Sequence, residues 1–309
     1  MAKNSSLTSA VEQLARNEGA SLVGFGNIER WENAPPEVHP HSILPITRSV
    51  IAIGMPQSRG ALMGIEEGTY WQAYNVDNYY LLNDVEGPRL LGKIVLYLEE
   101  LGHTAISVHN PFFHNQGQKL RPEHATGPDA IVSLRMVGVC CGLGELGHSK
   151  MFLSPEYGPR QRIFAVFTDA ELVPTPLFKG EICDGCLACV KDCEGNAIGN
   201  ERSIKVEIDG HTYSHAPIDD AACVRAHVGS TPELSPFWKG TEKPGEIPDY
   251  HRNIRDRYSH LSICGARSCI RSCMDHLEKT KRIDAQFNAP FISKPRWKIN
   301  PVKMNNETC

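Results

Sequence analysis

The sequence has no apolar run approaching the roughly eighteen residues that span a bilayer. Its first 20 residues contain neither the apolar stretch of a secretory signal nor a twin-arginine pair. The formal net charge is −4, so the chain has no overall basic surface of the kind that binds nucleic acid. These absences predict a cytoplasmic protein with no membrane partner.

Cysteine, in contrast, is abundant, with 11 residues in a chain of 309. Without a signal peptide, clustered thiols indicate metal binding rather than disulfides, because the cytosol keeps thiols reduced. Eight of the 11 lie between positions 183 and 273, which is the number that two four-iron clusters require. Of the others, Cys140 and Cys141 are interpreted as small buried hydrophobic residues, and Cys309 as a terminal residue without a role.

The stretch CDGCLACVKDC, residues 183–193, has the cysteine spacing of bacterial ferredoxins. In two-cluster ferredoxins the fourth cysteine of such a run binds the other cluster, so a remote cysteine must complete the first one. Zinc stays open as an alternative, because C-x2-C pairs also form zinc sites. Glu194 stands where ferredoxins usually have proline. The predicted groups are Cys183, Cys186, Cys189 and Cys273 for one cluster, and Cys193, Cys223, Cys264 and Cys269 for the other.

Helical and strand-like patterns alternate up to about residue 172 and indicate helices packed on a sheet. A hairpin is predicted at 203–214 around Asp209-Gly210, and a long loop at 109–129. The predicted fold class is α+β, with an α/β domain at 1–172, a ferredoxin-like domain at 173–280 and a tail at 281–309. Helices are predicted at 6–18, 88–102, 130–141 and 274–284, and strands at 21–26, 49–55, 104–108 and 162–169.

A second motif lies just before the cysteine run, in GLGELGHSKMFLSPEYGPRQRIFAVFTDAEL at 142–172. Its first three glycines would let the backbone approach a large flat ligand. The motif has neither G-x-G-x-x-G after a strand nor the lysine of a P-loop, so phosphate binding of those kinds is not indicated.

The order of GLG-x2-G, SPEYG, a strand ending in TD and the ferredoxin run closely resembles the cobalamin-dependent reductases. This group contains the reductive dehalogenases and the epoxyqueuosine reductases, and the match is most specific over 142–198. The resemblance implies a nitroreductase-like corrinoid-binding domain beside a module with two [4Fe-4S] clusters. Base-off cobalamin would lie between them, with the Cys183 cluster near cobalt and the Cys193 cluster as the electron entry point.

The resemblance also implies which residues contact the corrin. His148 departs from it, because epoxyqueuosine reductases commonly have lysine at this position. His148 could contact the cofactor tail or the metal, although a hydrogen-bonded or solvent-facing histidine is the favoured interpretation. The implied corrin contacts are Gly142, Leu143, Gly144, Gly147, Ser154, Pro155, Tyr157 and Gly158.

Reductive cleavage also requires a proton donor near the substrate. Counting back from GLG places the acidic residue of epoxyqueuosine reductases on Pro128, one position before Asp129. Reductive dehalogenases use a tyrosine supported by a basic residue, and Tyr79 and Tyr80 are candidates here. The long loop offers His114 as a further donor.

The predicted function is a cobalamin- and iron–sulfur-dependent reductase of a small molecule, cleaving a carbon–halogen or carbon–oxygen bond. An external ferredoxin or flavodoxin would supply the electrons. Epoxyqueuosine-type modification of tRNA stays open but is not favoured, because the chain lacks the helical-repeat extension and is acidic overall. A non-catalytic electron carrier for another protein's corrinoid is the alternative from a different class.

Overall fold

The computed structural model describes residues 2–66, 70–109, 132–229, 233, 264 and 267–291. Its strands are β1 (Leu22–Asn27), β2 (Ser49–Pro56), β3 (Ala105–Val108), β4 (Glu145–Leu146), β5 (Phe152–Leu153), β6 (Gln161–Thr168), β7 (Ile204–Ile208) and β8 (His211–His215). Its α-helices are α1 (Ala2–Asn17), α2 (Arg59–Glu66), α3 (Trp71–Ala73), α4 (Gly87–Glu100), α5 (Leu134–Cys140), α6 (Ala188–Lys191), α7 (Asp220–Val228) and α9 (Cys269–Lys279). Three 3-10 turns, η1 (Ile28–Trp31), η2 (Pro36–Val38) and η3 (Pro40–Ser42), and a π-helix, η4 (Tyr74–Glu86), complete the elements.

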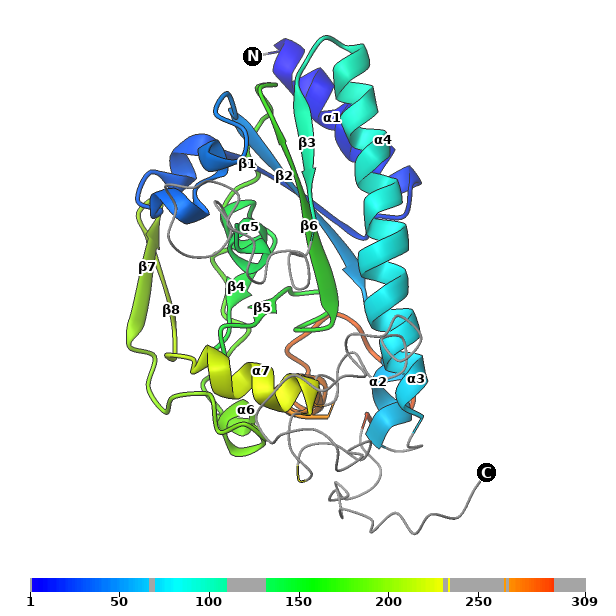
Figure 1. The fold of residues 1–309 in the computed structure, drawn as a ribbon, viewed down its shortest axis with the longest axis vertical. Helices are drawn as coiled ribbons and strands as arrows, with labels where there is room; N and C mark the ends of the chain where they lie inside the picture. Colours follow the sequence, from blue (N-terminus) through cyan, green and yellow to red (C-terminus); the bar gives the residue numbers. More distant parts are fainter. Residues whose placement is uncertain are drawn as a thin grey trace, which may run out of the picture.

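The centre of the molecule is a four-stranded sheet in the order β1-β2-β6-β3, and every pairing in it is antiparallel (Figure 1). Because side chains alternate along a strand, neighbouring residues of β2 enter different cores. Ile51 and Ile53 pack with α1 and α4, whereas Val50 and Ala52 pack with α5. Strands β1, β2 and β6 are therefore buried on both faces, which explains why they read as continuous apolar runs, whereas the edge strand β3 is partly exposed.

The cysteine-bearing region packs against one end of this layered unit, below the sheet in Figure 1. The connecting segment pairs with the free edge of β1, since Thr175 N donates to Phe25 O at 2.9 Å and Phe25 N donates to Thr175 Oγ1 at 3.0 Å. Further on, Met274 and Leu277 of α9 share a hydrophobic cluster with Leu62 of α2 and with the π-helix η4. The cysteine region is thus joined to the sheet domain by a shared core.

The predicted hairpin is confirmed as β7 and β8. Asp209 and Gly210 at its turn have φ values of 47° and 73°, the left-handed conformations that a tight two-residue turn requires. The four predicted strands of the sheet are also present, and the mixed helix and strand composition fits the predicted class. The domain boundaries and the nitroreductase-like character stay predictions.

The helix expected at 274–284 is wrong at both ends, because α9 begins at Cys269 and ends at Lys279. Lys281 adopts a left-handed φ of 54°, which ends the helical path. The amides of Asp284 and Ala285 instead donate to Pro155 O and Glu156 O at 2.9 and 3.2 Å.

Of the predicted loop at 109–129, only His109 lies within the described residues. In the part of the chain that the structure describes, no helix has the length and apolar character needed to span a membrane.

Candidate metal centres and cofactor site

The first predicted group of cysteines is brought together by α6 and α9, which contact each other. Cys183 and Cys186 precede α6, Cys189 lies on α6, and Cys273 lies on α9. Burial raises the pKa of the Cys273 thiol well above its ordinary value, and the charges of Cys183, Cys189 and Cys186 raise it further. A cysteine 80 or more residues away in sequence is therefore the neighbour of the C-x2-C-x2-C run.

The thiols of the second group also raise one another's pKa values. Burial raises the pKa of Cys269 to about 12, and the charges of Cys223 and Cys193 act in the same direction. The pKa of Cys264 is raised well above its ordinary value by burial and then by Cys269, with Cys223 and Cys193 among the further causes. Cys189 also acts on Cys269, so the two groups are adjacent.

Two left-handed residues shape the loop that carries the first three thiols. Gly185 has a φ of 75° and Leu187, which caps α6, has a φ of 59°. Leucine rarely adopts this conformation, whereas glycine does so readily. The loop therefore turns tightly twice between Cys183 and Cys189, as a segment that wraps several thiols around one site must.

Two groups of four thiols fit iron–sulfur clusters by their chemistry, because thiolates are the ligands of such clusters. All ten cysteines within the described residues are free of disulfides. Backbone amides also point at two of the sulfurs, with His148 N 3.3 Å from Cys183 Sγ and Ala197 N 3.2 Å from Cys193 Sγ. Hydrogen bonds of this kind help to set a cluster's reduction potential.

A different set of ligand atoms lies at the surface, where Asp184, Cys186 and His276 place one atom each within 4.8 Å of one another. His276 Nε2 is 2.8 Å from Asp184 Oδ2. Cys186 belongs to the first thiol group as well, so an ion bound here would compete with a cluster for it. Stoichiometric zinc is therefore an outcome that a metal analysis must test.

The two cysteine segments are tied together by a buried ion pair between Glu194 and Arg267. Arg267 Nη2 lies 2.8 Å from Glu194 Oε1, and the two side chains are 2% and 13% exposed. Ser268 adds a second tie by donating from its hydroxyl to Asp192 O at 2.8 Å. Glu194, where ferredoxins usually have proline, thus connects the residue after Cys193 to the start of α9.

We expect Arg267→Ala to lower the free energy of unfolding by about 3–5 kcal/mol, because it removes the buried cation that faces the Glu194 carboxylate. Denaturant unfolding of the reconstituted protein measures this loss. The control is Arg48→Ala, whose partner Glu171 is 58% exposed and whose pair should contribute no more than ~1 kcal/mol. Equal losses in the two variants would contradict a structural role for the buried pair.

The glycine motif is packed against the chain itself. Gly142 has a φ of 78°, and a Cβ atom there would lie 2.3 Å from Pro176 O. A Cβ atom on Gly144 would lie 1.9 Å from Leu153 O. Both glycines are therefore required by close approach of backbone to backbone, and the corrin contacts of Gly142, Leu143, Gly144 and Gly147 stay predictions.

The SPEYG stretch forms a tight turn between β5 and β6. Ser154 and Gly158 pair through both backbone amides, at 3.0 and 2.8 Å, and Tyr157 N donates to Ser154 Oγ at 3.1 Å. Pro155 O accepts from the amide of Asp284, which follows α9. The turn thus contacts the cysteine region, while its contact with a corrin also stays a prediction.

His148 is 3% exposed, and its Nε2 lies 2.8 Å from Gly199 O. Its own carbonyl accepts from Ala216 N at 2.9 Å. The ring is therefore engaged with the backbone, as in the hydrogen-bonded interpretation that the sequence favours over cofactor contact.

The π-helix η4 carries both candidate tyrosines. Tyr79 is 5% exposed, and the Arg162 guanidinium lies 4.4 Å from the centre of its ring. The ring of His227 on α7 is 6.1 Å away, so Tyr79 lies where the sheet domain meets the cysteine region. Tyr80 is partly buried. His114 and Asp129 lie outside the described residues.

Sequence reasoning missed three side chains around these sites. Glu145 Oε1 accepts from the amides of Ile182 and Cys183 at 2.9 and 2.7 Å and so holds the start of the cysteine run. The positive charge of Arg135 on α5 lowers the pKa values of Cys223 and Cys269, against the larger effect of burial. Arg162 is the third. Each acts on a partner at least 37 residues away, so no local pattern identifies it.

The chain matches no protein-family model. It is 32% identical over 117 residues to the tetrachloroethene reductive dehalogenase of Desulfitobacterium hafniense, which covers 37% of this chain and 18% of that protein. The enzyme of the same name from Sulfurospirillum multivorans is 38% identical over 60 residues, 18% of this chain and 12% of that protein. Over these stretches the chain is similar in sequence to the reductive dehalogenases.

Solved structures agree with this relationship at the level of fold. A catabolic reductive dehalogenase covers 97% of this chain and 42% of its own, with a TM-score of 0.56 and 19% identity. A second reductive dehalogenase structure, which suggests a mechanism for B12-dependent dehalogenation, gives a TM-score of 0.56 at 20% identity and covers 98% of this chain and 42% of its own. The epoxyqueuosine reductase of Bacillus subtilis gives 0.50 at 16% identity, over 96% of this chain and 69% of its own. The chain spans less than half the length of these dehalogenases.

Proposed function

We propose that this protein is a reductase that holds two four-iron clusters and one base-off corrinoid and reductively cleaves a carbon–halogen or carbon–oxygen bond of a small molecule. The grouping of eight thiols into two sets of four carries the proposal, because it supplies a relay for single electrons beside a sheet domain of the dehalogenase fold. The relatives that share this fold are oxidoreductases.

The bound cofactors would supply the electrons and the reductive bond cleavage. The chain's own residues would hold the clusters through the two thiol groups and contact the corrin through the glycine and SPEYG motifs. A tyrosine of η4, or a donor from the segment before α5, would hold the proton that the leaving group or the new carbon centre takes up. The shared core between η4 and α9 would keep water away from this region.

Modification of tRNA is less well supported. A short basic stretch that could contact RNA lies at Lys279, Lys281 and Arg282, but the Arg282 side chain is already engaged. Its Nε donates to Ile182 O at 2.9 Å, and Asp184 Oδ2 lies 3.9 Å from the same atom. The Arg282 side chain therefore holds the backbone at the start of the cysteine run.

We expect one tightly bound corrinoid per chain, without coordination by its benzimidazole. Titration of the anaerobically reconstituted protein with hydroxocobalamin should give an absorption spectrum that lacks the base-on form. The control is the same titration of free hydroxocobalamin with the buffer and reductant alone. Absence of corrinoid binding under reducing conditions would instead support the electron-carrier alternative.

A further inference from the structure

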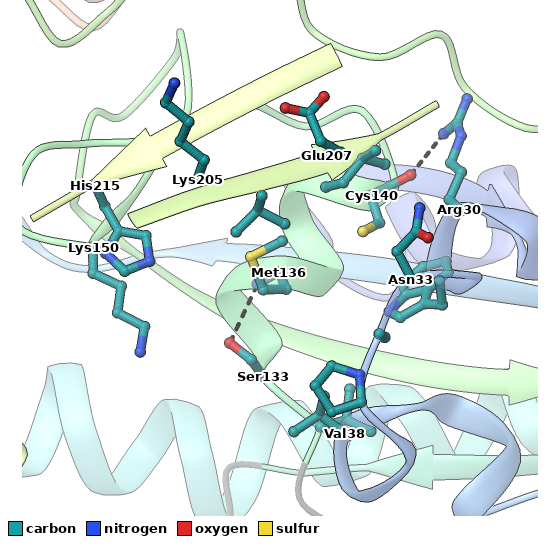
Figure 2. Close-up of a pocket in the computed structure, with 16 residues that line it drawn as sticks. Arg30, Asn33, Val38, Ser133, Met136, Cys140, Lys150, Lys205, Glu207 and His215 are labelled. Carbon is teal, nitrogen blue, oxygen red and sulfur yellow. Dashed lines mark hydrogen bonds between the residues drawn. The ribbon is translucent and has the colours of Figure 1, made fainter. Parts of the chain in front are cut away.

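A cavity of about 620 Å³ lies between α5, the hairpin and the turns η1 and η2 (Figure 2). It is within the size range of ~300–1,000 Å³ that small-molecule sites usually have. Arg30 and Asn33 lie on one side of it, Lys150 and His215 on the other, and Met136 of α5 lies between them. None of the eight cysteines of the two thiol groups lines it.

The wall of the cavity combines apolar side chains with positive charge. Trp31, which is 4% exposed, lies beside Met136 and Val206 along the apolar part. Three cations line the cavity, Arg30, Lys150 and Lys205, against the single carboxylate of Glu207. A ligand that fits must therefore have an apolar body and a negative group.

Arg30 supplies the observation that points most directly to an anion. It is 9% exposed, and its Nη1 donates to Cys140 O at 2.6 Å, but its buried Nε has no hydrogen-bond partner. Asp209 Oδ2 is 3.9 Å from that nitrogen, which is beyond hydrogen-bond distance, and its side chain is 65% exposed. The guanidinium therefore adds a buried positive charge to the cavity wall without a close carboxylate partner, and an anionic group in the cavity would help to balance this charge.

His215 adds a neutral acceptor. Its ring is 6% exposed, and Nδ1 lies 2.7 Å from Ala216 O, which places the proton on Nδ1 and leaves the Nε2 lone pair available. Burial lowers the pKa of His215, and the nearby charges of Lys150, Arg202 and Arg135 lower it further. A hydroxyl or N–H of the ligand can therefore donate to this ring.

We propose that this cavity binds a planar apolar group that carries one phosphate, carboxylate or sulfonate. Such chemistry has two sources, a free small organic anion or the nucleotide end of a bound corrinoid, and the second rests on the proposed function. In either case the anion contacts Lys150 and Lys205, Arg30 adds positive charge from the opposite side of the cavity, and the ring packs on Trp31 and Met136.

The test uses two fluorescent probes, 8-anilinonaphthalene-1-sulfonate and its uncharged analogue N-phenyl-1-naphthylamine, with the reconstituted protein. Lys150→Gln combined with Lys205→Gln should weaken the sulfonate probe about tenfold and the neutral probe less than twofold. Met136→Trp, which fills the cavity, should weaken both probes. Lys93→Gln, whose native lysine pairs with Glu18 on the surface of α4, is the matched control and should change neither.

The two sources are distinguished by competition. If the nucleotide end occupies the cavity, cobalamin displaces the sulfonate probe and cobinamide, which lacks the nucleotide, does not. If a free anion is the ligand, the probe still binds after cobalamin has saturated the protein. If the protein binds the probe but takes up no corrinoid, the inferred binding site stands and the proposed function is refuted. Equal effects of the lysine changes on both probes, or no effect of Met136→Trp, would overturn the inference.

Discussion

Replacing Cys273 with alanine should remove one cluster and leave the other, so that iron falls from about eight to about four per chain. The reason is that the charges of Cys183, Cys189 and Cys186 act most strongly on Cys273, whereas those of Cys223 and Cys193 act most strongly on Cys269 of the same helix, so the two are assigned to different clusters. The iron and sulfide content of the reconstituted protein and its low-temperature electron paramagnetic resonance spectrum measure the effect.

The crossed assignment of Cys273 and Cys269 is tested most directly by comparing variants. Cys273→Ala should have the spectrum of Cys186→Ala, and Cys269→Ala should have that of Cys223→Ala. Pairing in sequence order would instead make the Cys273 and Cys269 variants alike, and that outcome would refute the crossed assignment. Cys140→Ala is the control, because the Cys140 thiol lines the cavity beside α5 and should affect neither cluster. Stoichiometric zinc with no iron would refute both clusters.

That these cysteines lie near one another was predictable from sequence because cluster ligation imposes a spacing rule that is independent of the surrounding fold, whereas their division between two clusters stays a prediction. The strands of the sheet were predictable for a related reason, since β2 is buried on both faces and its sequence is correspondingly apolar. The Asp209-Gly210 turn was predictable because few residue pairs tolerate two left-handed conformations in succession.

Features that depend on distant partners were not predictable. The π-helix η4 has no period that the sequence displays, and its packing on Arg162 and α9 decides its path. The role of Glu145 requires the amides of Ile182 and Cys183 to lie beside it. The glycines of GLG suggest contact with a flat ligand, yet the atoms that crowd Gly142 and Gly144 belong to Pro176 and Leu153. Local sequence patterns indicate which backbone conformations a residue tolerates, whereas tertiary packing determines which atoms it contacts.

Loss of the proton donor should lower turnover about 100- to 10,000-fold, which is the usual contribution of a positioned acid. Of the candidates, Tyr79 has the best-defined surroundings. The Arg162 guanidinium lies 4.4 Å from its ring centre. Arg162 Nε also donates to Asn78 O of the same π-helix at 3.0 Å, and this hydrogen bond fixes the position of the guanidinium.

The measurement is steady-state reduction with an artificial electron donor by Tyr79→Phe, Tyr80→Phe, His114→Ala and Asp129→Asn. Phenylalanine keeps the ring against Arg162 and removes only the hydroxyl, so cluster spectra and corrinoid binding should stay native while turnover falls. Tyr97→Phe is the matched control, because Tyr97 packs on α4 against the core formed by α1 and the sheet. Near-native rates in all four variants would show that the substrate does not approach η4 or the segment before α5. A loss that is matched by Tyr97→Phe would show that the effect is general rather than one of proton donation.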